Sequence, residues 1–193
     1  RPVRVRAGRT RRLGRLEEAR AAWQAAIAGR PVRHEEHYGY AELCLFLGRE
    51  DDYRAARRTL LEAFADLDGS MFAERTGRAC LLLPASGDEL HRAAALADRA
   101  AALDRAQAGV FYPYYQFAGG LAAYRRGRFD RAIAVMRGDA AGVLGPAPRL
   151  VLAMALHQSG QVGEARKTLA DAVRSYDWSV AKARDQNDWI FHV

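Results

Sequence analysis

Apolar residues recur every three or four positions along most of this chain, and β-type alternation never lasts for more than a few residues. The pattern predicts an all-α protein. Residues 16–28 are representative, because Ala19, Trp23, Ala26 and Ile27 would share one face of a helix. Glycine and proline interrupt the pattern at intervals and divide it into helical hairpins. We predict five hairpins and a terminal capping helix, at about 1–30, 34–66, 71–105, 111–141, 147–177 and 180–193.

Four short segments with the same layout supply the turns of these hairpins. Each has a glycine, at position 14, 48, 127 or 160; the first two lie 34 residues apart and the last two lie 33 apart. A repeat of this length is typical of stacked helical hairpins. Each glycine is followed by a large apolar residue and, three positions later, an alanine, in the pairs Leu16/Ala19, Tyr53/Ala56, Phe129/Ala132 and Val162/Ala165.

The spacing is less regular in the middle of the chain. Gly87 lies 39 residues after Gly48 and 40 residues before Gly127, so we expect longer loops around the third hairpin. Residues 86–89 have the sequence of a capping box, which predicts a helix start there.

A small residue also stands in the first helix of three hairpins, at Ala41, Gly120 and Ala153, where it would let the second helix approach closely. Together with the glycine turns, these residues resemble the tetratricopeptide repeat (TPR). The resemblance covers nearly the whole chain and implies an α–α superhelix, a TPR solenoid, of about five hairpins. It also implies one repeat domain over residues 1–193 with a concave groove that binds other proteins.

Some segments are similar to a narrower group, the C-terminal TPR region of planctomycete-type serine/threonine protein kinases. The similarity lies in residues 40–48, 73–84, 145–157 and 184–190. It implies that the chain is the regulatory or sensor part of a bacterial signalling kinase, and the missing N-terminal methionine leads us to expect a piece of a longer protein. The phosphate loop and the His-Arg-Asp and Asp-Phe-Gly motifs of a kinase are absent from the sequence, so we expect no catalysis in this region.

The net charge of +7 is concentrated at the N-terminus. The first twelve residues contain no acid, and the rest of the chain is close to balance, so the excess comes from Arg1, Arg4, Arg6, Arg9, Arg11 and Arg12. An arginine-rich helix can bind the phosphates of nucleic acids. Nucleic-acid binding is therefore a second alternative, although a neighbouring repeat or an acidic partner could equally cover these arginines.

The two cysteines, Cys44 and Cys80, stand in apolar runs. Such a pattern is typical of buried thiols in a reducing compartment. No apolar run approaches the roughly 20 residues that span a bilayer, and the basic N-terminus has no apolar stretch behind it. We expect a cytoplasmic protein without membrane contact.

The segment His34-Glu35-Glu36-His37 is the best candidate for a metal site. The zinc-protease motif needs two histidines four positions apart and a third ligand, whereas the spacing here is three and no third ligand is evident. The alternative is a solvated helix start whose acids interact favourably with the helix dipole. Residues 166–168 end like a phosphate loop but lack the glycine before the lysine. We expect no metal, no cofactor and no catalytic residue.

The expected function is a scaffold that binds a peptide or a partner domain in the concave groove, mainly through aromatic and apolar contacts. Each candidate side chain could instead pack between neighbouring helices. The lysine and asparagine clamp with which some TPR proteins hold chaperone tails is missing, which disfavours a chaperone-tail adaptor. The sequence names no partner and leaves self-association open. The candidate groove residues are Tyr38, Glu42, Phe46, Tyr114, Phe117, Leu121, Tyr124, Leu150, Met154 and His157.

Overall fold

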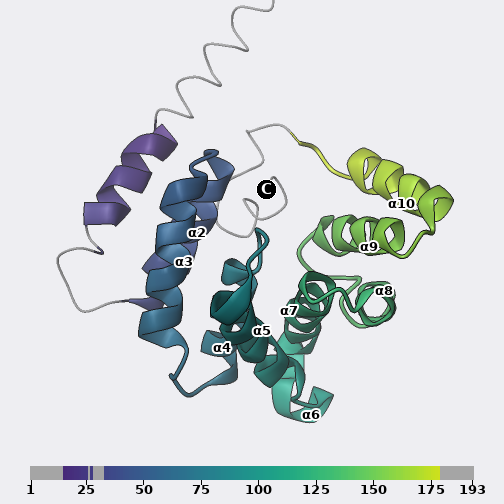
Figure 1. The fold of residues 1–193 in the computed structure, drawn as a ribbon, viewed down its shortest axis with the longest axis horizontal. Coiled ribbons are helices and arrows are strands. Elements are labelled where there is room, and N and C mark those ends of the chain that lie inside the picture. The colour runs from purple at the N-terminus through teal and green to yellow at the C-terminus, as the bar shows by residue number, and fades with distance from the viewer. Residues whose placement is uncertain (1–14, 26, 28–32, 179–193) are drawn as a thin grey trace, which may run out of the picture. The chain divides into compact units, whose positions relative to one another are not determined.

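The computed structural model describes residues 15–25, 27 and 33–178, and the regular structure in them is entirely helical (Figure 1). The prediction of an all-α protein is confirmed. The chain divides into two compact units: one holds the described residues up to Thr59 together with Trp178, and the other is Leu60–Asp177. The predicted helix before Gly14, the turn at Gly14 and the terminal capping helix lie outside the described residues.

The first unit contains a helix over residues 15–25, α2 (His34–Phe46) and the beginning of α3 (Glu50–Phe64), which continues into the second unit. A small core forms around the fully buried Leu43, and it includes Leu16, Ala19, Trp23, Phe46 and Leu47. Ala19 and Trp23 therefore share the inward face that the sequence pattern predicts for this helix.

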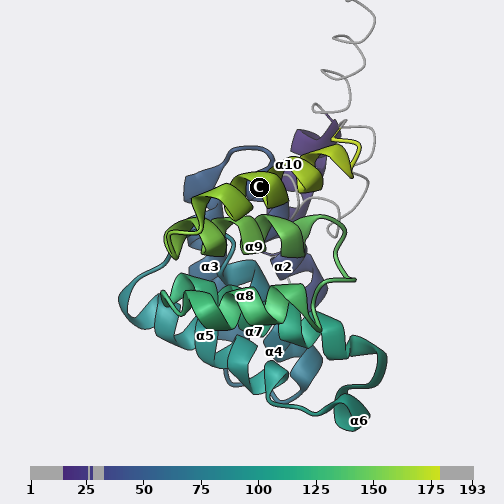
Figure 2. The same ribbon diagram turned by 90° about the vertical axis from the view of Figure 1, so that its right-hand side faces the viewer.

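The second unit is built mainly from three stacked hairpins. They are α4 (Ser70–Cys80) with α5 (Gly87–Ala101), α7 (Tyr112–Arg125) with α8 (Phe129–Arg137), and α9 (Ala147–Gln158) with α10 (Val162–Arg174). Each of these helices packs against the one that follows it, and Figure 2 shows α7 to α10 stacked in chain order. The first helices of the hairpins also contact one another, α4 with α7 and α7 with α9.

Three of the predicted glycine turns have the same backbone geometry. Gly48, Gly127 and Gly160 have φ angles of +72°, +72° and +83°, which favour glycine because it has no Cβ. In each turn the next residue donates its N–H to a carbonyl five positions back, as in a Schellman motif. The three bonds run from Arg49 to Cys44 (2.7 Å), from Arg128 to Ala123 (2.9 Å) and from Gln161 to Leu156 (2.9 Å).

Close helix approach depends on a glycine in two of the first helices. A Cβ added at Gly120 would lie 2.7 Å from Met136 Cε of α8. A Cβ added at Gly77 would lie 2.8 Å from the backbone nitrogen of Ala97 in α5. The role predicted for Gly120 is confirmed. Gly77 has the same role in the third hairpin, although the repeat pattern in the sequence did not identify it.

The end of α8 differs from the prediction. It lies at Arg137 rather than near residue 141, because the chain leaves helical geometry at Gly138. α9 begins at Ala147, and the proline that follows is tolerated because it lies in the first turn of the helix.

Helix capping also differs from the prediction. Ser86 is the residue before α5, as expected, but its side chain forms no capping hydrogen bond. The capping box lies instead at α6 (Arg105–Ala108), a short helix that was not predicted, followed by a 3-10 turn over Gly109–Phe111. There Asp104 accepts from the Gln107 N–H at 2.8 Å, and the Asp104 N–H donates to the Gln107 side chain at 3.1 Å.

Candidate functional site

The first helices of the first two hairpins in the second unit, α4 and α7, lie side by side and point the same way. At the N-terminal ends of α4 and α7, the hydroxyl oxygens of Ser70 and Tyr115 are 3.0 Å apart. At their C-terminal ends, Arg125 donates to the carbonyl oxygens of Leu81 (2.7 Å) and Leu82. α7 also contacts α9, the first helix of the last hairpin.

Exposed apolar side chains gather where α4 and α7 begin. Met71 and Tyr114 stand six positions before the close-approach glycines Gly77 and Gly120, and they are 39% and 37% exposed. The neighbouring Phe111 is also exposed, and its ring stacks on that of Tyr115 with 6.3 Å between centroids. We call this surface the apolar edge, and it comprises Met71, Phe72, Val110, Phe111 and Tyr114.

The sequence analysis identified Tyr114 and missed the other four members of the apolar edge. Met71 could have been found, because Gly77 followed by Pro84 has the same separation as Gly120 followed by Gly127. Aligning the third hairpin on Gly77 places Met71 opposite Tyr114. Phe111 and Val110 lie in a 3-10 turn, where a helical repeat gives no signal.

The first helix of the last hairpin presents a second apolar stripe. On α9, Leu150, Met154 and His157 follow one another at spacings of four and three, and therefore lie on one face. Leu150 is half-buried, while Met154 and His157 are exposed. All three were predicted, and a partner could contact them without any rearrangement.

The other predicted groove residues are less accessible. Phe117 and Leu121 are 2% and 3% exposed, and Tyr38 and Glu42 are likewise buried. Phe46 is half-buried in the core of the first unit. Tyr124 is half-buried too, with its ring 5.9 Å from that of Phe129 and the Arg125 guanidinium 5.4 Å from its centroid. The structure thus places Tyr114 among the other members of the apolar edge, and it brings the three α9 residues together. The side chains of Phe117, Leu121, Tyr38 and Glu42 are too deeply buried for a partner to contact them.

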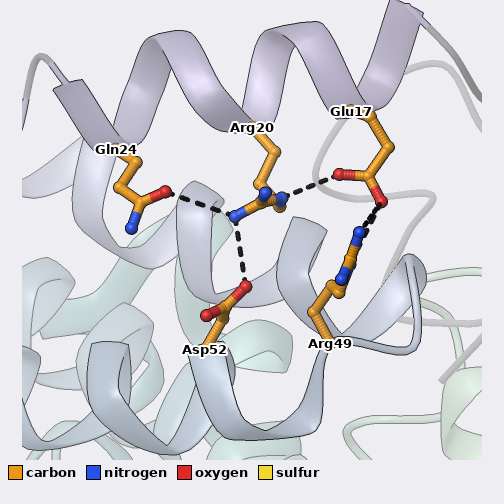
Figure 3. A network of polar contacts seen from close by, with 5 residues as sticks. All are labelled: Glu17, Arg20, Gln24, Arg49 and Asp52. Atoms are coloured by element: carbon orange, nitrogen blue, oxygen red, sulfur yellow. Dashed lines mark hydrogen bonds and ion pairs between the residues drawn. The ribbon is translucent and has the colours of Figure 1, made fainter.

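A network of charged side chains joins the helix over 15–25 to the start of α3 and the turn before it (Figure 3). Arg20 donates to Glu17 at 2.8 Å, to Asp52 at 3.1 Å and to Gln24 at 3.3 Å. Arg49 in turn donates to the other oxygen of Glu17 at 3.1 Å. The hydrogen bond from Arg20 is the largest influence on the Glu17 carboxyl group and lowers its pKa. These contacts attach the helix over 15–25 to α3 and the turn before it.

Two weakly acidic groups are buried in the same unit. Burial raises the pKa of Cys44 to about 11 and the pKa of Tyr40 to about 12. A thiol with so high a pKa is almost entirely protonated at neutral pH and reacts slowly. Cys44 and Cys80 are both buried thiols that no disulfide joins, as the sequence pattern predicts.

The two histidines of the candidate metal segment are buried rather than solvated. His34 and His37 are 7% and 4% exposed, and burial lowers the pKa of His37. The interpretation of this segment as a solvated helix start was therefore wrong for the histidines, although Glu35 is exposed. Over residues 15–25, 27 and 33–178, no group of three His, Cys, Asp or Glu side chains is placed to hold a metal ion.

The arginines that suggested nucleic-acid binding, Arg1 to Arg12, lie outside the described residues. Within the described part, acidic and basic residues are equal in number. None of the helices in that part is long and apolar enough to cross a membrane.

Comparison with protein-family models, with curated proteins and with solved structures gave no significant match for this chain.

Proposed function

We propose that this chain is a TPR-like protein-interaction scaffold whose second unit binds a partner protein. The observation that carries the proposal is the exposure of Met71, Phe111 and Tyr114 on neighbouring helix ends. Contiguous exposed apolar side chains on a folded protein are typical of interaction sites. Aromatic and methionine side chains are also enriched at the buried centres of interfaces, and these centres contribute most of the binding energy.

The TPR-like character of the scaffold has separate support. The same turn geometry occurs at Gly48, Gly127 and Gly160, and small residues stand where the helices of a hairpin cross. First helices that contact one another in order would line the concave face of a superhelix. The α9 stripe of Leu150, Met154 and His157 would extend that face from the apolar edge.

The experiment compares proteins captured from a lysate of the source cell by the tagged full chain and by its variants. Phe111→Ala with Tyr114→Ala should reduce capture of a specific partner by about tenfold or more, as expected for hot-spot residues. Leu169→Ala is the matched control, because Leu169 is an equally exposed apolar residue on α10. Circular dichroism should show unchanged helicity in all three proteins. Equal capture by the double variant and the wild type would contradict the proposal.

Phe117 is not suitable for this test, because its side chain is 2% exposed. Removing a buried phenylalanine side chain costs about 3–5 kcal/mol of stability. A loss of partner after Phe117→Ala would therefore report unfolding, whereas Tyr114→Ala separates binding from folding.

A further inference from the structure

A cluster of arginines surrounds the turn between α7 and α8. Arg125 is engaged with the carbonyl oxygens of Leu81 and Leu82, and Arg126 forms an ion pair with Asp98. Arg128 and Arg131 differ from them. Both are exposed, and neither side chain has a hydrogen-bond or ion-pair partner among the residues that the structure describes.

These two arginines border an open depression of about 470 Å³ between the α7–α8 turn and the α9–α10 turn. The half-buried ring of Phe129 forms an apolar wall, which contact with the Tyr124 ring holds in place. The hydroxyl group of Ser159 donates to the Leu156 carbonyl at 3.0 Å and accepts from Gln161 at 3.0 Å. The site therefore carries a net positive charge beside an aromatic ring, since two arginines and one aspartate are among its lining residues, which are Gly127, Arg128, Phe129, Asp130, Arg131 and Ser159.

The positions of these cations are unfavourable for the helix itself. Arg128 directly precedes α8 and Arg131 lies in its first turn, where the helix dipole repels positive charge. The first turns of α3 and α5 carry only acidic charges, whereas α9, like α8, has an arginine (Arg149) in its first turn. At α8 Asp130 offsets a single arginine. Because neither arginine stabilises the start of its own helix, both guanidinium groups remain available to a ligand.

We propose that this depression binds an acidic peptide segment of a partner protein. Two carboxylates of the segment would pair with Arg128 and Arg131, and an apolar side chain between them would rest on Phe129. This inference rests on the proposed function, because it gives the scaffold a second contact surface and names the chemistry of the segment that fits it. Nucleic acid fits less well, because phosphate recognition uses an extended basic track and the described part of the chain carries no net charge.

The test measures fluorescence anisotropy of a labelled glutamate-rich peptide with a central phenylalanine, titrated with the full chain at low salt. Arg128→Gln with Arg131→Gln should weaken binding about tenfold, the loss expected from two charge-assisted contacts. The matched control is Arg166→Gln with Lys167→Gln on α10, which removes the same charge from two other exposed residues and should leave binding unchanged. A glutamine-rich peptide of equal length should not bind, and affinity for the glutamate peptide should fall as salt rises.

A second readout excludes a merely structural effect. The Arg128→Gln and Arg131→Gln double variant should unfold at a slightly higher temperature than the wild type, because it relieves repulsion at the start of α8. Weaker binding together with equal or higher stability supports the proposal. Equal weakening by the α10 control, or tighter binding of a single-stranded oligonucleotide that depends on the same arginines, would overturn it.

The same titration separates this site from the proposed function. Phe111→Ala with Tyr114→Ala should bind the glutamate peptide normally, because these residues lie on the apolar edge and not in the depression. If the peptide binds through Arg128 and Arg131 but no partner depends on the apolar edge, the proposed function fails at that edge alone. If a partner depends on the apolar edge but the peptide does not bind through Arg128 and Arg131, only the acidic-peptide site fails.

Discussion

Gly77 allows the backbones of α4 and α5 to approach closely, because a glycine has no side chain to stand between them. A Cβ at this position would lie 2.8 Å from the Ala97 nitrogen and 3.0 Å from the Ala93 carbonyl oxygen, and neither backbone atom can move without shifting α5. We therefore predict that Gly77→Ala lowers the free energy of unfolding by about 2 kcal/mol, the usual cost of overpacking. Urea denaturation of the full chain measures this effect.

Gly163 provides the control for that prediction, because it lies in α10 and a Cβ added there would meet no atom within 4 Å. Gly163→Ala should leave stability unchanged or raise it by about 0.5 kcal/mol, since alanine loses less backbone entropy on folding. If both variants behave alike, helix propensity rather than close approach governs these positions.

The buried Tyr40 and Cys44 predict how stability depends on alkaline pH. Burial raises the pKa of Cys44 from 9.0 to about 11 and that of Tyr40 from 10.0 to about 12. The folded state favours the protonated forms, so their stabilising contribution is complete below pH 9 and is lost as pH rises from about 9 to 12. Tyr40→Phe should make this decline shallower in chemical denaturation. Tyr114→Phe, at an exposed position, should not change it.

At the scale of elements, Arg20 carries much of the attachment between the helix over 15–25 and the rest of the first unit (Figure 3). Its side chain is 15% exposed and bonds Glu17 within the helix and Asp52 outside it. We predict that Arg20→Gln weakens docking of this helix by about 1–2 kcal/mol, because Glu17 and Asp52 lose a shared charged donor. Hydrogen exchange of residues 15–25 measures the change.

Arg54 is a matched control for Arg20. It also pairs with two carboxylates, those of Glu50 and Asp51, but all three residues belong to α3 and are exposed. Exposed pairs within one helix contribute little. Arg54→Gln should therefore leave exchange of residues 15–25 unchanged, and a similar effect of both variants would mean that net charge, not docking, is responsible.

The helices and turns also show which features of the fold could be predicted from the sequence. Glycine turns at Gly48, Gly127 and Gly160 were predictable, because a positive φ selects glycine locally. The burial of Phe117 and Leu121 was not, since it depends on which helices cover α7 and not on the order of residues within it. α6 was missed for another reason. Its single turn is too short to show periodicity, and only its Asp104 capping box marks it.

At the scale of the molecule, the apolar edge and the arginine depression lie at opposite ends of α7. The apolar edge lies where α4 and α7 begin, and the arginine depression lies where α7 ends and α8 begins. Between them, α7 carries the buried Phe117 and Leu121 and contacts α4, α5, α8 and α9. A rigid central helix would hold both surfaces at a fixed separation, which suits a scaffold that contacts one partner at two points.

This arrangement predicts an uneven distribution of stability along the second unit. In a stack where each helix packs mainly on its neighbours, a terminal helix opens more readily than a central one. Among the described helices of this unit, α10 packs on α9, whereas α7 packs on helices from all three hairpins. Among the helices of the three hairpins, hydrogen exchange should therefore be fastest in α10 and slowest in α7.

Paired alanine-to-glycine variants test whether opening is local. Ala172 in α10 and Ala97 in α5 are both fully buried, and each change to glycine costs about 1 kcal/mol of helix stability. Ala172→Gly should speed exchange in α10 and leave α4 and α5 protected, because the end of the stack can open alone. Ala97→Gly should speed exchange in α4, α5 and α7 together, since α5 packs against both of the other two. Uniform loss of protection in both variants would instead mean that the unit unfolds as a single cooperative block.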